Sequence, residues 1–171
     1  MSIVDRSKWL PISFVILLAS CGLPERARNH FIIYPLEYEG RYDELIDLYK
    51  KDLAKGKYLS PSIYLRLSHA YLCKRDYQNA RQYLLEGLQR FPEDGHVMWN
   101  AGKYYTYIEG LCDKGLEFLF KAREVYRTSD WKLLIEEDIR IVERLSVNTA
   151  GGKHCRAEAE DYLRLSCVPK K

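Results

Sequence analysis

The sequence predicts an all-α protein in which antiparallel helical hairpins stack side by side and a C-terminal helix caps the stack. Three observations lead to this prediction. A pattern of apolar and small residues occurs twice between Ser60 and Tyr126. Amphipathic stripes at helical spacing recur along the chain. Glycine or proline stands at several of the predicted helix ends, where these residues are favoured.

The two copies of the pattern are separated by a nearly constant distance in sequence. Positions in the first helix of each copy are 34 residues apart, and positions in the second helix are 35 apart. The matched pairs are Leu67 and Ala101, Ser68 and Gly102, Tyr71 and Tyr105, Ala80 and Gly115, Leu84 and Leu119, and Gly87 and Ala122. A fixed period in this range marks stacked helical hairpins. One extra residue is therefore expected between the helices of the second copy.

Small residues at the matched positions predict close packing between the two helices of each hairpin. We expect Ser68 to lie against Ala80 in the first copy, and Gly102 against Gly115 in the second. Pro92 is expected to end a helix, because proline has no backbone N–H to donate.

This spacing resembles the tetratricopeptide repeat, whose signature is W-x2-L-G-x2-Y, then A-x3-F, then P. The first copy matches with Tyr64, Leu67, Ser68, Tyr71, Ala80, Leu84 and Pro92. The second copy matches with Met98, Ala101, Gly102, Tyr105, Gly115 and Leu119, without the proline. Upstream, Gly40-Arg41-Tyr42, Leu45 and Tyr49 match the second helix of an earlier unit. The resemblance covers about half of the chain and implies a tetratricopeptide-repeat-like (TPR-like) α-solenoid; an unrelated helical bundle is the alternative.

Residues 1–20 have the features of an export signal peptide. Arg6 and Lys8 precede an apolar run from Trp9 to Leu18, and small residues follow it. The run is too short to span a bilayer as a permanent helix. The sequence therefore predicts cleavage and export from the cytoplasm.

Residues 18–21, Leu-Ala-Ser-Cys, resemble the bacterial lipobox. The resemblance implies that Cys21 becomes the first mature residue and receives lipid, including palmitate. A thiolate is the nucleophile that such a transfer needs, and several acyl chains on one residue give stable anchoring. An ordinary cleaved signal or an uncleaved signal anchor is the alternative. Gly22 replaces the aspartate that retains such lipoproteins in the inner membrane, which favours the periplasmic face of the outer membrane.

The charge balance gives no indication of nucleic-acid binding. The chain has 27 Lys and Arg residues and 24 Asp and Glu residues, and it contains no basic tract. The 151 residues after the signal allow one domain.

Four cysteines follow Cys21, and an exported protein can join them in three connectivities. They are Cys73, Cys112, Cys155 and Cys167. A continuous helix over residues 156–166 would hold Cys155 and Cys167 about 18 Å apart, which disfavours that pair. Unpaired cysteines packed in the core are the alternative.

The predicted elements follow in order. Residues 21–39 are expected to form a tether and either an irregular first helix carrying Pro35 or an extended arm. Residues 40–127 are expected to hold the TPR-like repeats, with helices over residues 41–53, 61–74, 77–91, 95–109 and 113–126. Gly56 is expected to end the first of these helices, and Ser60-Pro61 to begin the second.

Residues 128–171 are expected to cap the stack. Thr128 or Ser129 caps a helix over residues 130–145, whose apolar stripe covers the last hydrophobic face while its charges face water. A glycine-containing linker over residues 148–153 and a short amphipathic helix over residues 156–166 follow.

The sequence lacks the spacing of known catalytic motifs, so we expect no enzymatic activity and no cofactor. Gly110 and Gly115 have the spacing of the glycines in a phosphate-binding loop. Leu116 and Glu117 follow them instead of the Lys-Ser/Thr pair that such a loop requires. His154 and Cys155 would supply two ligands, which is fewer than a zinc site requires. No metal is predicted.

Stacked hairpins predict protein binding instead, because their first helices form a concave groove. The resemblance places the groove residues between the packing positions of each first helix. They are Leu65, Arg66, His69 and Leu72 in one unit, and Trp99, Asn100, Lys103 and Thr106 in the next. Trp99 is the best single anchor for a partner, although it is equally suited to packing.

The first functional hypothesis is therefore a lipid-anchored, non-catalytic envelope adaptor that binds a protein or peptide in this groove. The alternatives are an envelope-acting enzyme or its accessory subunit, and a surface-exposed lipoprotein that binds host or matrix molecules.

Overall fold

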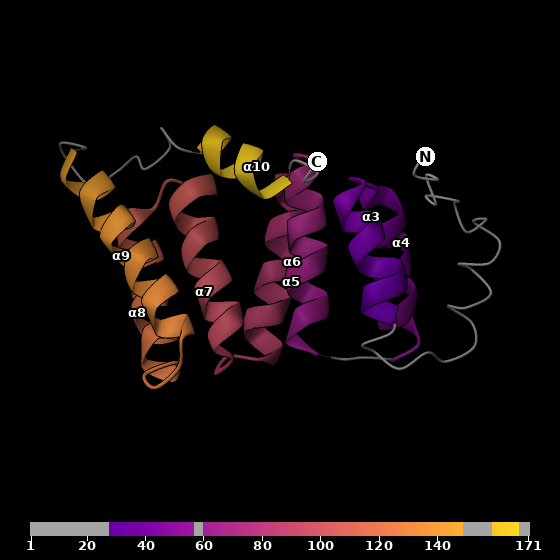
Figure 1. The fold of residues 1–171 in the computed structure, drawn as a ribbon, viewed down its shortest axis with the longest axis horizontal. Coiled ribbons are helices and arrows are strands. Elements are labelled where there is room, and N and C mark those ends of the chain that lie inside the picture. Colours follow the sequence, from indigo (N-terminus) through magenta and orange to yellow (C-terminus); the bar gives the residue numbers. More distant parts are fainter. Residues whose placement is uncertain (1–27, 57–59, 149–158, 168–171) are drawn as a thin grey trace, which may run out of the picture. The chain divides into compact units, whose positions relative to one another are not determined.

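The computed structural model describes residues 28–56, 60–148 and 159–167, in which all regular secondary structure is helical (Figure 1). The fold is thus all-α, as predicted. The elements are η1 (Asn29–Ile33), α3 (Tyr34–Tyr38), α4 (Tyr42–Ala54), α5 (Pro61–Cys73), α6 (Tyr77–Arg90), α7 (Gly95–Lys103), η2 (Tyr104–Ile108), α8 (Cys112–Val125), α9 (Trp131–Asn148) and α10 (Ala159–Cys167), where η denotes a π-helix.

Several predicted features lie outside the described residues. They include the export signal over residues 1–20, the lipidation site Cys21, the linker and Cys155. Within the described ranges, none of the helices combines the length and apolar character that crossing a bilayer would require.

The described residues fall into two compact units, the first within residues 28–41 and the second within residues 42–167. In the first unit, the segment predicted as an irregular helix or an extended arm is helical, because η1 continues directly into α3. Pro35 lies in the first turn of α3, at the junction with η1. Ile32, Ile33 and Leu36 are buried.

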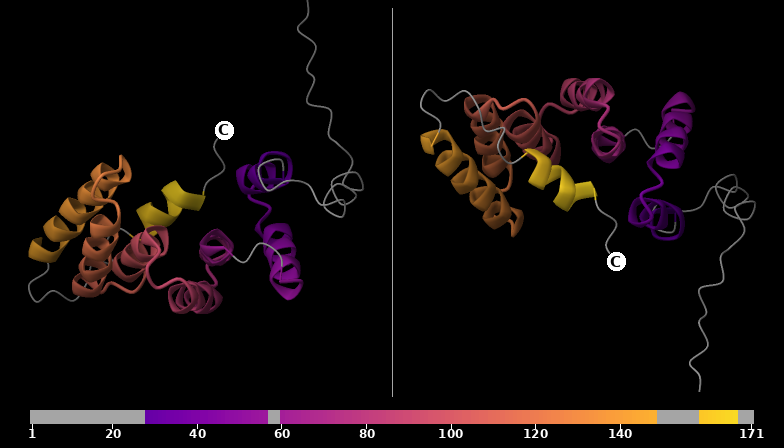
Figure 2. Two further views of the ribbon diagram at one scale, coloured as in Figure 1. Left: turned by 90° about the horizontal axis from the view of Figure 1, so that it is seen from below. Right: turned by 90° about the horizontal axis from the view of Figure 1, so that it is seen from above.

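In the second unit, consecutive helices pack against one another. The closest pairs are α5 with α6, α7 with α8, α8 with α9 and α4 with α5. Figures 1 and 2 show α5, α6, α7 and α8 side by side, and the short connections between them make neighbours antiparallel. The core runs between these helices and includes the fully buried Leu67, Leu84 and Leu119.

Local sequence signals account for the ends of these helices. The Asp76 and Asp94 side chains accept backbone N–H groups at the starts of α6 and α7, as N-cap residues do. Gly56 follows α4 with a φ of +62°, a conformation that favours glycine. Ser60 occupies the predicted N-cap position of α5, but its hydroxyl bonds to the Ser62 hydroxyl at 2.8 Å instead of capping the helix.

The two hairpins contain the same aromatic contact at matched positions. Tyr71 of α5 stacks on Tyr83 of α6 with ring centroids 5.6 Å apart, and Tyr105 of η2 stacks on Phe118 of α8 at 5.5 Å. The first residues of these pairs are 34 apart in sequence and the second are 35 apart. The repeated pattern in the sequence therefore corresponds to repeated packing in the structure.

Small residues are required where α7 meets α8. A Cβ atom added at Gly102 would lie 2.7 Å from Leu119 Cγ and 3.1 Å from the Gly115 carbonyl oxygen, so a larger residue there has no room. The predicted contact between Gly102 and Gly115 is confirmed.

The extra residue of the second copy does not lengthen the connection between its helices. The segment predicted as one α-helix over residues 95–109 instead changes from α7 to the π-helix η2. A π-helical turn closes an i→i+5 hydrogen bond and so holds more residues per turn than an α-helical one. The insertion is thus absorbed inside the first helix. Within η2, Thr106 is fully buried and its hydroxyl oxygen makes no hydrogen bond among the described residues.

Candidate functional site

The candidate site is the surface on which the C-terminal helix α10 lies. α10 contacts α5 and η2, and it lies on the side of these helices that faces away from α6 (Figure 2). Among the side chains of α10 that the structure describes, Leu163 is buried, with 4% of its surface exposed. We call the residues that hold α10 the α10 contact face. They are Tyr42 of α4, His69 and Cys73 of α5, and Tyr107 of η2.

Noncovalent contacts hold α10 at its middle and at its C-terminal end. The Tyr107 ring stacks on the Tyr162 ring, with centroids 4.7 Å apart and an interplanar angle of 14°. The Tyr42 hydroxyl donates a 2.8 Å hydrogen bond to the carbonyl oxygen of Cys167. The Nε2 atom of His69 lies 3.2 Å from the carbonyl oxygen of Ser166.

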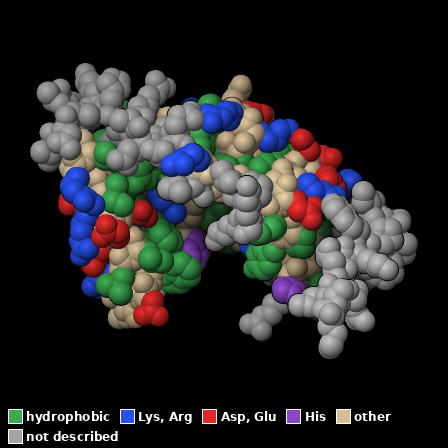
Figure 3. Space-filling model, turned by 45° about the horizontal axis from the view of Figure 1, so that its top comes forward, with side chains coloured by type: hydrophobic (Ala, Val, Ile, Leu, Met, Phe, Trp, Pro, Cys, Tyr) green, Lys and Arg blue, Asp and Glu red, His purple; other side chains and the backbone are tan. Residues whose placement is uncertain are grey.

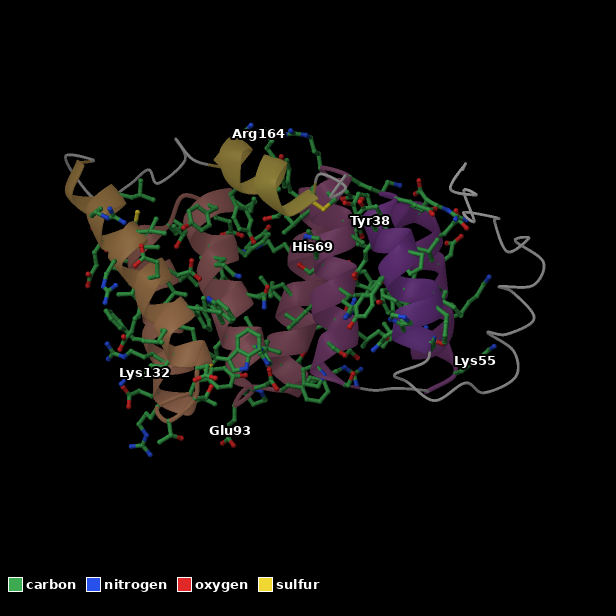
Figure 4. The ribbon with its side chains drawn as sticks, in the orientation of Figure 1. Tyr38, Lys55, His69, Glu93, Lys132 and Arg164 are labelled. Atoms are coloured by element: carbon green, nitrogen blue, oxygen red, sulfur yellow. A yellow bond between two sulfur atoms is a disulfide. The ribbon has the colours of Figure 1, made fainter. Side chains whose placement is uncertain are left out.

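A disulfide between Cys73 and Cys167 adds a covalent tie, with Cα atoms 5.2 Å apart. Figure 4 shows this disulfide at the end of α10, with His69 beside it on α5. Cys112, which is fully buried in α8, is also disulfide-bonded. The alternative of unpaired core cysteines is therefore wrong for these three residues. The pairing that the sequence disfavoured, Cys155 with Cys167, does not occur.

His69, Cys73 and Cys167 place three potential metal-ligating atoms within 4.8 Å of one another. Metal binding by cysteine requires the thiolate. Because the two sulfur atoms are bonded to each other here, the imidazole is the one ligand this cluster offers in its disulfide form.

The environment of α10 keeps its tyrosine neutral. Burial raises the pKa of Tyr162 to about 12, although a hydrogen bond with Ser166 opposes the shift. The phenol therefore stays protonated at physiological pH and acts as a packing and hydrogen-bonding group.

The predicted groove residues of the first repeat, which includes α5, differ in their burial and contacts. His69 belongs to the α10 contact face, as described above. Leu65 and Arg66 are partly buried, and Leu72 is buried with 6% exposure. Leu72 is therefore largely unavailable to a partner in this structure, whereas the role of the other positions stays a prediction.

In the second repeat, which includes α7 and η2, most of the predicted groove residues are buried or bonded to other residues of the protein. Trp99 is 9% exposed, and Thr106 is completely buried. The Asn100 amide donates a 2.8 Å hydrogen bond to the carbonyl oxygen of His96. Of the two roles considered for Trp99, the structure therefore supports packing, and Thr106 cannot line a groove in this structure.

Trp99 is buried because α9 covers it. Its Nε1–H donates a 2.5 Å hydrogen bond to Oδ2 of Asp138, and its ring meets the Trp131 ring edge-on at 5.8 Å. The Nζ atom of Lys103 lies 4.3 Å from the centre of the Trp99 ring, within the range of a cation–π interaction.

Desolvation acts on both charged residues beside Trp99. Burial lowers the pKa of Lys103, and the nearby Asp138 carboxylate opposes this shift. Burial raises the pKa of Asp138, while the Trp99 hydrogen bond and Lys103 oppose the shift. Burial thus disfavours the charged form of both side chains, and the attraction between the two opposite charges partly offsets this effect.

This raised pKa predicts a pH dependence of stability. The stabilisation that Asp138 provides through its bound proton is fully present below its ordinary pKa of 3.8 and is lost as the pH rises through the folded-state value. Asp138→Asn keeps an acceptor oxygen for Trp99 and cannot titrate. We therefore expect the wild type to lose stability relative to Asp138→Asn between about pH 4 and about pH 7. Thermal melts of both proteins, followed by circular dichroism at the two pH values, measure the difference, and parallel pH profiles would contradict the assignment.

No family model, curated protein or solved structure matches this chain.

Several residues of these two clusters belong to no motif that predicts their contacts. The sequence pattern places Tyr42 in the partial repeat, Tyr107 in the helix over residues 95–109 and Tyr162 in the short amphipathic helix. The amphipathic pattern of residues 156–166 was the available signal that this segment covers another surface. The prediction that the charges of the helix over residues 130–145 face water is wrong for Asp138, because its carboxylate is partly buried against Trp99.

Basic and acidic side chains are interspersed on the face shown in Figure 3, with apolar side chains between them. On that face, the described residues form no large patch of one sign.

Proposed function

We propose that this protein is a non-catalytic, lipid-anchored adaptor of the bacterial cell envelope. In this proposal, a TPR-like stack formed by α4 to α8 and capped by α9 binds an amphipathic helix of a protein partner on the α10 contact face. Lipid on Cys21 would hold the adaptor at the membrane, with the periplasmic face of the outer membrane favoured.

The observation that carries the proposal is the packing of α10 on α5 and η2. A nine-residue amphipathic helix from a distant part of the chain lies across α5 and η2 through an aromatic stack and one buried leucine. Helix-in-groove recognition likewise places apolar side chains of one amphipathic helix against a hydrophobic surface. The surface is thus suited to a helix, and α10 occupies it as an internal ligand.

The matched packing of the two hairpins supports the TPR-like part of the proposal. The aromatic stacks of Tyr71 with Tyr83 and of Tyr105 with Phe118 recur with the period of the sequence pattern. A period of this length is the mark of hairpin solenoids, whose first helices supply the binding surface. α5 and η2, the elements under α10, belong to the first helices of their hairpins.

The partner is expected to carry an aromatic residue next to a leucine on the apolar face of its helix, as Tyr162 and Leu163 do. The aromatic ring would stack on Tyr107, and the leucine would take the place of Leu163. Arg164, which follows them, is exposed on α10 (Figure 4). A partner helix should accordingly be tolerant of a charge at that position.

The test uses the full chain with α10 released from its seat. Tyr162→Ala, Leu163→Ala and Cys167→Ser are combined to remove the stack, the buried leucine and the disulfide. A fluorescein-labelled peptide of residues 154–168, with serine in place of its cysteines, is then titrated while anisotropy is recorded. We expect saturable binding to this variant and none to the wild type, in which α10 covers the surface.

A matched control adds Tyr107→Ala to the released variant. Loss of an aromatic pair worth about 0.5–1.5 kcal/mol should weaken peptide binding several-fold. If the released variant fails to bind the peptide while its circular dichroism spectrum is unchanged, or if Tyr107→Ala has no effect, the α10 contact face is not a helix-binding surface.

A further inference from the structure

We propose that Cys73–Cys167 is a redox-active disulfide, which exchanges with dithiol reductants and thereby releases α10 from α5. His69 is assigned the role of stabilising the thiolate of Cys73 when the disulfide opens. The exchange reaction itself does not depend on the proposed adaptor function.

The position of the disulfide makes it accessible. Cys73 and Cys167 are both partly exposed, whereas Cys112 is completely buried. Thiol–disulfide exchange requires the attacking thiolate to reach a sulfur atom, so exposure is the first condition for reactivity. The bridge joins residues 94 apart in sequence and is located where the last turn of α10 meets the last turn of α5.

His69 supplies the second condition, a favourable environment for one of the two sulfur atoms. It lies four residues before Cys73 on α5, and this spacing places both side chains on one face of the helix. The Sγ atom of Cys73 is 3.6 Å from Nε2 and 4.0 Å from Nδ1 of the imidazole. A protonated histidine beside a cysteine lowers the thiol pKa and so stabilises the thiolate.

Because His69 lies beside the sulfur atom of Cys73, the two sulfur atoms are expected to have different roles in the exchange. A thiolate of the reductant attacks Sγ of Cys167, the Cys73–Cys167 bond breaks, and its electron pair remains on Sγ of Cys73. The second thiol of the reductant, once deprotonated, attacks the mixed disulfide and expels Cys167. The protein disulfide gains two electrons and two protons, and the dithiol loses the same number as it becomes a disulfide. Exchange is faster when the departing sulfur has the lower pKa, which assigns Cys73 as the leaving group.

Reduction of the disulfide is expected to weaken the attachment of α10 to α5 and η2. The helix has nine residues, and isolated helices of this length are marginal in water. The contacts that remain include the stack on Tyr107, the burial of Leu163 and two hydrogen bonds to backbone oxygens. We therefore expect reduction to release α10. Exposure of the α10 contact face to a partner would be the consequence, and this last step alone rests on the proposed function.

The experiment follows the reduction of each cysteine in the folded full chain. The protein is incubated with dithiothreitol in a buffer containing EDTA, and samples are alkylated with iodoacetamide and mapped by mass spectrometry. We expect Cys73 and Cys167 to become alkylated together and well before Cys112, which serves as an internal control. Equal rates for Cys73 and Cys112 would overturn the proposal.

His69→Gln tests the role of the imidazole. Glutamine retains an N–H group to donate to the Ser166 carbonyl oxygen, but it carries no positive charge. We expect it to slow the reduction of Cys73 about tenfold, since exchange rates follow the pKa of the departing thiol. An unchanged rate, in a variant with an unchanged circular dichroism spectrum, would exclude His69 from the reaction.

Amide hydrogen exchange and peptide binding separate the remaining steps. Reduced protein should show faster amide exchange in α10 than oxidised protein, and unchanged protection of α10 would contradict its release. The labelled peptide described above is then titrated into the reduced wild type. If α10 is released and the peptide still does not bind, the proposed function fails while the redox reaction stands.

Discussion

Replacing Trp99 with alanine is expected to destabilise the protein by about 3–5 kcal/mol, the range for truncation of a buried aromatic residue. Trp99 is one of the buried residues of a core cluster that also contains Leu119, Ile135 and Val142. The variant would leave a cavity between α7 and α9, and it would remove the hydrogen-bond donor from the partly buried carboxylate of Asp138. Urea unfolding followed by circular dichroism measures the change in the free energy of unfolding.

Trp131→Ala is the matched control for this prediction. Trp131 belongs to the same aromatic cluster, but 45% of its surface is exposed. We expect it to cost about 1 kcal/mol, the contribution of one aromatic contact. If the two substitutions cost the same, Trp99 is not the buried member of the pair, and its earlier assignment as a groove residue would regain support.

Replacing Gly115 with alanine is expected to destabilise the protein by about 1–3 kcal/mol, even though alanine is the better helix former. The added Cβ would lie 3.0 Å from the carbonyl oxygen of Gly102 and 3.2 Å from Cβ of Thr106, and it would collide with the Thr106 hydroxyl. Thr106 is fully buried, so its side chain has little room to move away. Urea unfolding of the variant gives the magnitude.

A double-mutant cycle with Thr106→Ala tests the cause. If the collision with Thr106 dominates, the double variant Thr106→Ala, Gly115→Ala should be more stable than the sum of the two single changes predicts. Strict additivity would instead assign the cost to the Gly102 backbone. The first hairpin offers a comparison, because Ala80 occupies the matched position there and is accommodated with complete burial.

Local sequence signals were sufficient to place the ends of four helices of this protein. The boundaries of α4, α5, α6 and α8 agree with the predicted ranges to within one residue, because caps, glycines and prolines act within a single turn. The contact between Gly102 and Gly115 also followed from the sequence, since two copies of one pattern at a fixed spacing constrain which faces meet.

The conformation of residues 104–108 could not be predicted in this way. The spacing revealed one extra residue between matched positions, but a longer connection and a π-helical turn satisfy the same count. The choice depends on packing, since η2 keeps the Tyr105 ring stacked on Phe118 while burying Thr106 without a hydrogen-bond partner among the described residues.

The sequence by itself determined that the described chain is helical, where α4, α5, α6 and α8 begin and end, and which small residues lie between α7 and α8. The tertiary structure alone decided that Cys73 pairs with Cys167, that α10 lies across α5 and η2, and that α9 buries Trp99 through Asp138. The physical reason is the range of the interactions. Caps and amphipathic stripes join residues within a few positions of each other, whereas these contacts join residues 94 and 39 positions apart, and many alternative pairings satisfy the same local pattern.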